Sequence, residues 1–518
     1  MTHELENRVT GRGVIWAISL VLLGYTTSLW LGWPQTATDR IAAVGGGHEA
    51  PNVVRPEHRA STASEAHPPF SMIAPFALLL IGIAVFPLVP GVADWWDSNL
   101  HRLYVALALG LATLFYYLLL FEHPITGHFP ATHVVAANSV GLNLASTWTV
   151  IENAIFGEYV PFIVLLFTLY TISGGIRIEG NLHAHPSTNT WFLATGALLA
   201  SCIGTTGAAM LLIRPLLETN RERTRVSHTV VLFIFTVCNC GGCLLPLGDP
   251  PLFLGYLRGV PFLWTLRLWP EWLLVNCGLL VVYYLWDRFW HYPHETLRDI
   301  VRDETQVRQL RLRGIWPNAL LLLGVVASIA LLDPSKPIPG TSWHPWLYLR
   351  EAVQLLLVLF SLALSSDAVR LSNNFNYHAI TEVAVLFLGI FICMQPPLQM
   401  LHVRGPELGL HTAEHFFWAT GSLSSVLDNA PTYVVFFTTA QSLGGGHLIA
   451  GVQEELLVAV SLGAVFLGAM TYIGNGPNFM VKTIAEKAGV PMPSFFGYIG
   501  YSCAILLPLF ALTAWLLI

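Results

Sequence analysis

The sequence predicts an all-α polytopic membrane protein built from two inverted repeats of about five spans each, each with a re-entrant hairpin and a broken helix, plus one extra N-terminal span. Three observations predict this class. The 518 residues are 54% hydrophobic and only 11% charged, whereas soluble domains carry about 25% charged residues. Long apolar runs recur along the chain, near the roughly 20 residues that a spanning helix needs. The two halves of the chain also share short sequence patterns at a nearly constant distance.

Roughly eleven apolar runs can form membrane spans. The first, 14–33, is as long as a span and ends in no convincing cleavage site, so we expect a membrane helix rather than a signal peptide. Two further segments, 191–213 and 416–439, are interrupted by polar residues, and we expect each to be a re-entrant hairpin. The remaining runs are 72–92, 103–121, 159–176, 230–256, 272–286, 315–332, 352–364, 379–401, 456–473 and 495–518.

Basic loops predict the orientation, because Lys and Arg are retained on the cytoplasmic side. The most basic loops are 287–314 and 214–225, whereas 122–157 contains neither Lys nor Arg. If the N-terminus is cytoplasmic and the runs cross the membrane in order, 122–157 lies outside. The two basic loops then both lie inside only if the first hairpin enters and leaves the membrane by the same face, and we expect the second hairpin to do likewise. We therefore predict an integral protein of the bacterial inner (plasma) membrane with its N-terminus in the cytoplasm.

An internal repeat relates the two halves of the chain. The shared features are a Glu at the start of an apolar run, the pattern F-x-A-T-G-x-L, and the pattern G-[D/N]-x-P-x-F. The partners are 224, 225 and 226 residues apart, which three chance matches would hardly produce. They begin at Glu158 and Glu382, at Phe192 and Phe417, and at Gly248 and Gly474. An odd number of spans in each repeat inverts the second repeat, as in many secondary transporters.

The runs, loops and repeat divide the chain into four predicted parts. The apolar positions of 122–157 leave open whether this segment is a loop or an interfacial helix. The parts are an N-terminal span with an external polar loop (1–71), repeat 1 (72–287, with hairpin 191–213 and broken helix 230–256), a cytoplasmic basic linker (288–314) and repeat 2 (315–518, with hairpin 416–439 and broken helix 456–480).

The expected site lies at the two hairpin tips and the two breaks, because irregular backbone at membrane depth survives only inside protein or beside a wet cavity. Gly and Pro free backbone carbonyls there, and Thr, Asn and Asp add oxygen ligands for a hard cation. A carboxylate inside a membrane is costly and is a functional candidate by default, although it can also cap a helix. The candidate ion-binding residues are Thr205, Thr206, Asn239, Gly248, Asp249, Asp428, Asn429, Thr432, Asn475 and Asn478.

Among these candidates, Asp249, Asp428 and Asn429 are the expected sodium ligands, and the two acids are the expected proton carriers. Glu158 and Glu382, expected at helix ends near opposite faces, are candidates for a proton path or for carboxylates favoured by a helix dipole. No cofactor is expected beyond the transported ions, Na⁺ and H⁺. No arginine is expected inside the core, since Arg214 falls at a membrane edge.

Other classes of function fit less well. All seven cysteines lie in apolar segments, which argues against a disulfide framework. Cys238, Cys240 and Cys243 form a cluster that either packs in the core or binds a metal, and with His228 it is the only candidate for an intramembrane enzyme. The sequence has no P-loop for an ATP-driven pump, and we expect no nucleic-acid partner.

Two stretches carry a family resemblance: N-C-G-G-C-L-L-P-L-G-D-P from Asn239, and S-S-V-L-D-N-A-P-T from Ser424. They resemble the breaks and hairpins of the ion transporter superfamily, in particular NhaD-type sodium/proton antiporters and the CitMHS-like (citrate-transporter-like) group. The resemblance implies a scaffold and a transport part in a lipid bilayer, commonly a homodimer, with ions held at the tips and breaks. The first tip, 203–206, differs from the Asp-Asn pair of the antiporters and from the Ser-Asn-Thr of dicarboxylate carriers.

We therefore expect sodium (or lithium)/proton antiport by alternating access rather than enzymatic activity. The alternative is sodium- or proton-coupled transport of an organic anion such as citrate or a dicarboxylate, and export of an oxyanion is a third possibility. The substrate, the stoichiometry and the direction of flux are not fixed by the sequence.

Overall fold

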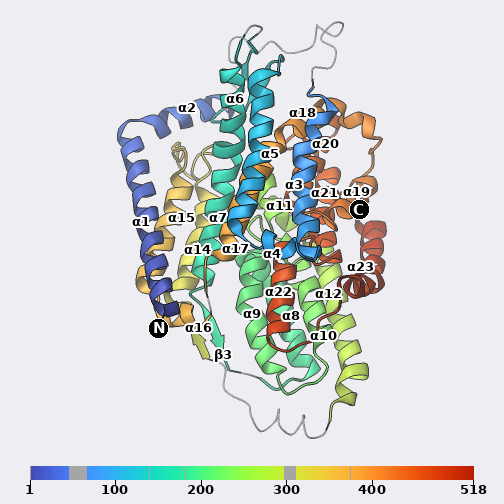
Figure 1. Cartoon of the computed structure of the whole chain (residues 1–518). Coiled ribbons are helices and arrows are strands. Elements are labelled where there is room, and N and C mark those ends of the chain that lie inside the picture. Colours follow the sequence, from blue (N-terminus) through green and yellow to red (C-terminus); the bar gives the residue numbers. More distant parts are fainter. Residues whose placement is uncertain (1, 46–66, 139–140, 181, 297–310, 374) are drawn as a thin grey trace. The chain divides into compact units, whose positions relative to one another are not determined.

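A computed structural model describes residues 2–45, 67–138, 141–180, 182–296, 311–373 and 375–518, with the backbone alone for 2–11, 44 and 45. The chain is mostly helical, at 73%, and its few strands are short (Figure 1). The predicted all-α class is therefore confirmed. Arg298, Arg302 and Arg308 of the predicted basic linker lie outside the described residues, as do 46–66 of the predicted external loop.

Six helices in the described residues are long and apolar enough to cross a membrane. A seventh candidate consists of α17 (His378–Cys393) and the segment Gln395–Leu408, which begins with α18 (Gln395–Arg404); the bend between the two is 44°. The six are Arg12–Trp30 in α1 (Thr2–Trp30), Phe70–Leu88 around α3 (Ala74–Val85), α5 (Asn99–Leu119), Leu144–Ser173, Trp264–His294 around α12 (Trp269–Trp286) and α23 (Phe495–Leu517).

The other predicted runs form shorter helices, so the number of long continuous spans is smaller than the number of apolar runs. Glycine and proline interrupt several of these runs, and a helix cannot continue through such points without loss of backbone hydrogen bonds. The shorter helices are α8 (Pro186–Ile203), α9 (Thr205–Thr219), α10 (Ser227–Thr236), α11 (Pro250–Leu257), α14 (Ile315–Leu331), α15 (Leu349–Leu364), α19 (Ala413–Ser424), α20 (Asn429–Leu443), α21 (Glu454–Leu467) and α22 (Gly476–Lys487).

Segment 122–157 is neither a plain loop nor an interfacial helix. It begins with an antiparallel pair, β1 (Ile125–Gly127) and β2 (His133–Val135), and then enters the 30-residue apolar helix Leu144–Ser173. The expectation that Glu158 marks a helix end is therefore wrong. Glu158 lies inside that helix, in a π-helical part (Glu152–Tyr159), and is buried. A glycine such as Gly157 often interrupts a helix, but here the helix continues through Gly157 in its π-helical part.

The described chain forms two compact units, and the first comprises Met1–Thr168, Leu323–Leu364 and Asn376–Gly405. In this unit α5 packs closely along α17, where a Cβ on Gly389 would lie 2.8 Å from the Cβ of Ala106. Phe162 stacks on Phe387 with ring centroids 4.8 Å apart. Small residues that let helix backbones approach are typical of membrane packing.

The second unit comprises Leu169–Leu322, Ser365–Phe375 and Pro406–Ile518. It contains the segments expected as hairpins and as breaks. In the first hairpin α8 turns into α9 through Gly204 alone, whose φ of +81° is easily reached only by glycine. In the second, α19 is joined to α20 by residues 425–428. Both units take segments from both halves of the sequence, and the predicted repeat boundaries remain a prediction.

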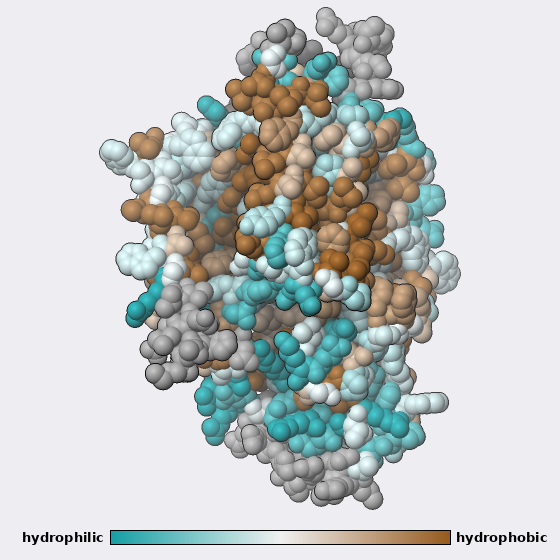
Figure 2. Space-filling view, viewed as in Figure 1, coloured by the Kyte–Doolittle hydropathy of each residue, from teal (hydrophilic) through white to brown (hydrophobic). Residues whose placement is uncertain are grey.

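Apolar side chains are exposed on the candidate spans, which is consistent with contact with lipid. Trp16 on α1 and Trp515 on α23 are 76% and 80% exposed, and Figure 2 shows hydrophobic residues over wide areas of one face. Soluble monomers rarely expose large continuous apolar areas. The chain is therefore an integral membrane protein by composition, span length and surface.

Candidate functional site

The two breaks of the second unit have the same local structure. Helix α11 begins at Pro250 directly after Asp249, and α22 begins at Gly476 directly after Asn475. Both preceding residues are extended, with φ and ψ of −141° and 143° at Asp249 and −150° and 138° at Asn475. Proline in the first helical turn is favourable, because that position needs no backbone N–H donor. Each break thus ends in a polar side chain at the start of a short helix.

The carboxylate of Asp249 accepts hydrogen bonds from three side chains. The Thr205 hydroxyl and the Asn475 amide donate to Oδ1, each over 3.0 Å. The Asn429 amide donates to Oδ2 over 2.6 Å. Asp249 itself is only 1% exposed. We call these four residues the Asp249 cluster.

The cluster brings together all four irregular segments that the sequence marks. Thr205 is the first residue of α9 and Asn429 is the first residue of α20, so each hairpin contributes one donor. Asp249 and Asn475 come from the two breaks. All three donors are neutral side chains. Among the described residues, no Lys or Arg side chain bonds to Asp249.

Close backbone packing fixes the position of each break. A Cβ on Gly248 would lie 2.1 Å from the carbonyl oxygen of Gly242, and one on Gly474 would lie 2.6 Å from that of Gly468. The Gly248 carbonyl also accepts a hydrogen bond from the Thr205 amide over 2.8 Å. Only glycine fits at both places, so Gly248 is needed for the backbone geometry of the break, and ion binding by Gly248 stays a prediction.

Asn239 and Asn478 form a second pair of amides in the same unit. Asn239 donates to the side-chain oxygen of Asn478 over 2.7 Å. Asn478 in turn donates to the carbonyls of Gly468 and Thr471 over 2.9 and 3.0 Å. These amides satisfy backbone groups that the breaks leave free, as buried polar groups require.

Two buried amide oxygens near these contacts have no hydrogen-bond partner among the described residues: Oδ1 of Asn239 and Oδ1 of Asn429. Beside Gly468, the Asn239 oxygen, the Gly474 carbonyl and the Ser424 hydroxyl converge, at 3.3, 3.3 and 3.6 Å from where a Cβ would be. Oxygen ligands of this kind suit a hard cation. The site therefore offers one carboxylate and several unsatisfied or convergent oxygens.

Besides Asn239, Gly248 and Asn478, three further predicted ion-binding residues lie outside the Asp249 cluster: Thr206, Asp428 and Thr432. Asp428 caps α20, with Oδ1 accepting the Ala430 amide over 3.0 Å. The Thr432 hydroxyl donates to the Asp428 carbonyl over 2.9 Å. Thr206 follows Thr205 on α9 and makes no hydrogen bond to Asp249 in the described structure. The structure thus gives Asp428 a capping contact, whereas its neighbour Asn429 reaches the carboxylate.

Glu158 and Glu382, the candidates for a proton path, belong to the first unit. Glu382 lies in the second turn of α17 and pairs with Arg102 of α5 over 3.1 Å. Arg102 also donates to the side chain of Asn99 over 2.8 Å. This ion pair ties α17 to α5, so Glu382 has a structural contact in addition to its predicted role.

Sequence reasoning missed two serines that hold the hairpins against the breaks. Ser201 donates to the Gly241 carbonyl over 2.6 Å, and Ser424 donates to the Ala464 carbonyl over 2.7 Å. The repeat spacing of 225 residues aligns Ser201 with Val426, because Ser201 follows Phe192 by nine residues whereas Ser424 follows Phe417 by seven. Both serines lie near the C-terminal end of the first helix of a hairpin, and this shared position is the sequence signal that could have identified them.

The three clustered cysteines are buried free thiols, and no group of three or more His, Cys, Asp or Glu in the described residues could hold a metal ion. His228 lies 3.0 Å from the carboxylate of Asp287 and stacks on His291 with centroids 3.8 Å apart. It is therefore engaged with another helix, and the structure shows no nucleophile–base pair built from these cysteines.

A model of the CitMHS_2 family, whose description reads "Putative citrate transport", matches residues 127–518, about three quarters of the chain. The match includes both hairpins, both breaks and the Asp249 cluster. No curated protein matches the chain. A transporter family indicates a carrier rather than an enzyme. The chain belongs to the CitMHS_2 family and is a CitMHS-like membrane protein of the ion transporter superfamily.

Proposed function

We propose that this protein is a secondary active transporter that exchanges sodium (or lithium) for protons, with Asp249 as the group that binds them in turn. One observation carries the proposal: a single buried carboxylate, from the first break, accepts hydrogen bonds from neutral donors of both hairpins and of the second break. An intramembrane carboxylate is costly and is therefore a functional candidate by default, and one without a basic partner is suited to bind a cation or a proton. The family match supports transport in general.

Competition at Asp249 follows from the chemistry of the cluster. With the carboxylate ionised, a cation can take the carboxylate oxygens as ligands, and the Asn429 amide can turn its unpartnered oxygen toward the ion. With the carboxylate protonated, the charge that attracts the cation is gone. Sodium and a proton thus exclude each other at the same oxygens. Asp428, next to Asn429, is proposed as a second acidic group near the ion, and Glu158 and Glu382 as steps of a proton path.

Alternating access is proposed to rest on two inverted repeats. The spacing of elements supports a repeat: α11 and α22 begin 226 residues apart, at Pro250 and Gly476, and so do α12 and α23, at Trp269 and Phe495. Inverted repeats with discontinuous helices place the ion site near the midplane in many transporters. The proposed setting is a homodimer in the bacterial inner membrane with a cytoplasmic N-terminus.

The test uses purified protein in liposomes that contain a pH dye and an acid interior. Sodium, lithium or potassium is added outside, for the wild type, Asp249→Asn and Asp428→Asn. Asp94→Asn, an exposed aspartate on α4 (Ala93–Trp96), is the matched control. Sodium- or lithium-driven dequenching that Asp249→Asn abolishes and Asp94→Asn retains supports the proposal. Equal dequenching in Asp249→Asn and the wild type would exclude Asp249 as the exchange group.

A second candidate, coupled transport of an organic anion such as citrate or a dicarboxylate, is favoured by the description of the family. The same liposomes distinguish it. A pH change that requires citrate, with no response to cations alone, assigns the protein to organic-anion transport. In that case Asp249 serves the coupling ion, and its Asn variant loses the citrate-dependent signal.

A further inference from the structure

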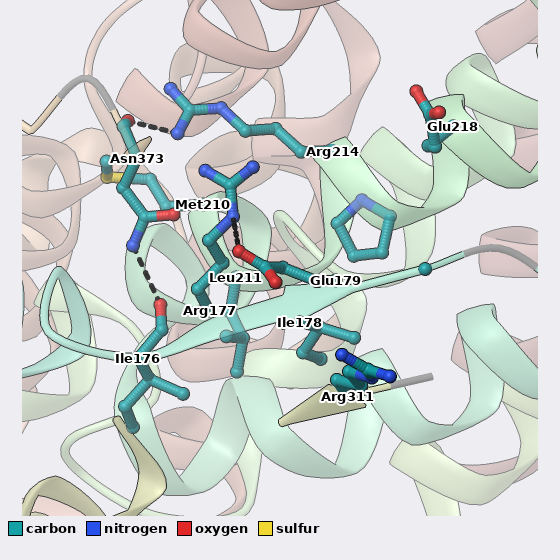
Figure 3. A pocket seen from close by; sticks show the side chains of 12 residues that line it. Ile176, Arg177, Ile178, Glu179, Met210, Leu211, Arg214, Glu218, Arg311 and Asn373 are labelled. Atoms are coloured by element: carbon teal, nitrogen blue, oxygen red, sulfur yellow. Dashed lines mark hydrogen bonds and ion pairs between the residues drawn. The ribbon is translucent and has the colours of Figure 1, made fainter. Parts of the chain in front are cut away.

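A cavity of about 690 Å³ lies in the second unit, between helix α9 and a two-stranded sheet (Figure 3). The sheet pairs β3 (Arg177–Glu179) with β4 (Arg311–Arg313) in antiparallel register. The sequence places Arg214 at a membrane edge, and the structure shows that Arg214 of α9 lines this cavity together with Arg177 and Arg311. A cavity of this size falls in the range of small-molecule sites.

One face of the sheet concentrates positive charge. Arg177 lies opposite Arg313, and Glu179 lies opposite Arg311. Because side chains alternate along a strand, these four share a face, so three arginines surround one glutamate. Like charges placed directly opposite are destabilising. Glu179 contacts both Arg177, over 3.2 Å, and Arg313, over 2.8 Å, and so one carboxylate is shared between two guanidinium groups.

The backbone holds two of the guanidinium groups in place. Arg214 donates to the carbonyl of Asn373, and Arg177 donates to the carbonyl of Ser372. Figure 3 shows Arg214 reaching from its helix toward Asn373, with Arg177 below it. A guanidinium has five N–H donors, so each of these two arginines keeps N–H donors that can bind a ligand. Arg214 is thus positioned by a neutral oxygen that does not cancel its charge, whereas Arg177 also shares the carboxylate of Glu179.

The charge around the cavity remains positive when the nearest partners are included. The other lining carboxylate, Glu218, pairs with Arg221 over 3.7 Å. Among the described residues, two lining glutamates thus stand against three lining arginines and two further arginines that pair with these glutamates, an excess of three positive charges. The arginines are Arg177, Arg214, Arg221, Arg311 and Arg313.

We propose that this cavity binds an anionic group with two or more negative charges, either a small polycarboxylic acid or a phosphorylated lipid headgroup. Arginine suits such ligands because its planar fork binds carboxylate and phosphate oxygens in pairs. The site is separate from the Asp249 cluster and goes beyond the proposed cation exchange. Thr205 and Arg214 are both on α9, about 14 Å apart along the helix axis, so a bound anion acts on the helix that begins at the Asp249 cluster.

The experiment measures anion binding to the full chain in neutral detergent by calorimetry, at constant ionic strength. Citrate is compared with succinate and acetate. In a second arm, nanodiscs of neutral lipid receive phosphatidic acid, and its competition with citrate is measured. The variants are Arg214→Gln, Arg311→Gln and Asp249→Asn. Arg288→Gln, an exposed arginine that does not line the cavity, is the control.

We expect citrate to bind more tightly than acetate, and each Gln variant to weaken binding about tenfold through the loss of charge-assisted hydrogen bonds. Arg311 is exposed on a strand, so its variant keeps the test valid if Arg214→Gln fails to fold. Arginine-dependent competition by phosphatidic acid supports the headgroup as the natural source of the anion. The proposal is overturned if neither anion binds, if the Gln variants bind like Arg288→Gln, or if Asp249→Asn alone abolishes binding.

Discussion

Asn475 donates a hydrogen bond to Asp249 over 3.0 Å, across 226 residues of sequence. The same interval separates Gly248 from Gly474, so the two residues hold the same position in the two halves of the chain. One half supplies a carboxylate there and the other supplies the amide that contacts it. If the repeats are inverted as proposed, this contact lies close to the axis that relates them, where both halves reach the proposed ion site.

Removal of the Asp249 carboxylate should affect stability according to what replaces it. Asp249→Ala leaves the donors of Thr205, Asn429 and Asn475 without an acceptor, and each buried unsatisfied donor costs about 1–3 kcal/mol. Asp249→Asn keeps an acceptor, and the Asn429 amide can turn its free oxygen toward the new amide. We expect a clearly lower Tm in detergent for the Ala variant and a nearly unchanged Tm for the Asn variant. Equal losses in both would contradict the hydrogen-bond geometry.

Two glycines of the second break should differ in their tolerance of substitution by alanine. A Cβ on Gly474 would lie 2.6 Å from two carbonyl oxygens, of Gly468 and Ser424, whereas a Cβ on Gly476 meets nothing within 4 Å. Gly474→Ala therefore forces the break apart, and we expect loss of folded protein in size-exclusion chromatography. Gly476→Ala should elute and melt as the wild type does. A tolerated Gly474→Ala would mean that the backbone does not pass so closely.

A pH-dependent contribution to stability is expected at Glu295, just beyond the Trp264–His294 helix. Burial alone would raise the pKa of Glu295, but hydrogen bonds from the amides of Thr224 and Arg225 and from the Thr224 hydroxyl lower it below its usual value. A carboxylate with a depressed pKa stabilises the fold above its unfolded pKa of about 4.3, and this contribution is lost as pH falls through the lower folded value. Glu295→Gln should therefore melt lower than the wild type at pH 7. The difference should shrink below about pH 4, and a difference constant with pH would rule this out.

Much of the candidate site could be predicted because glycine and proline mark it in the sequence. Asp249 and Asn475 each stand directly before a helix with proline in its first turn, and the repeat pairs them. The hairpin tips and breaks are expected to share one site, but the individual contacts with Asp249 could not be predicted. Thr205 and Asn429 reach Asp249 across 44 and 180 residues, and no local pattern encodes such contacts.

Other features depend on geometry that the sequence does not reveal. The π-helical stretch around Glu158 continues a helix where Gly157 suggests an end. The cavity beside Arg214 exists because residues 177–179 pair with residues 311–313, and a hydropathy pattern assigns both to loops. The capping contact of Asp428 depends on where α20 begins, which sequence patterns locate only to within about 2–4 residues.

The Thr205 hydroxyl should tune cation binding without being essential for the fold. Thr205→Val keeps the shape but removes one of the three hydrogen bonds that stabilise the ionised Asp249 carboxylate. A hydrogen bond to a charged group contributes about 1.5–3 kcal/mol, so we expect the sodium concentration for half-maximal proton flux to rise about tenfold or more. Thr205→Ser restores the hydroxyl and should return the value close to that of the wild type. If Val and Ser variants shift the sodium dependence equally, the methyl group of Thr205 matters rather than its hydroxyl, and the donor role assigned to Thr205 is wrong.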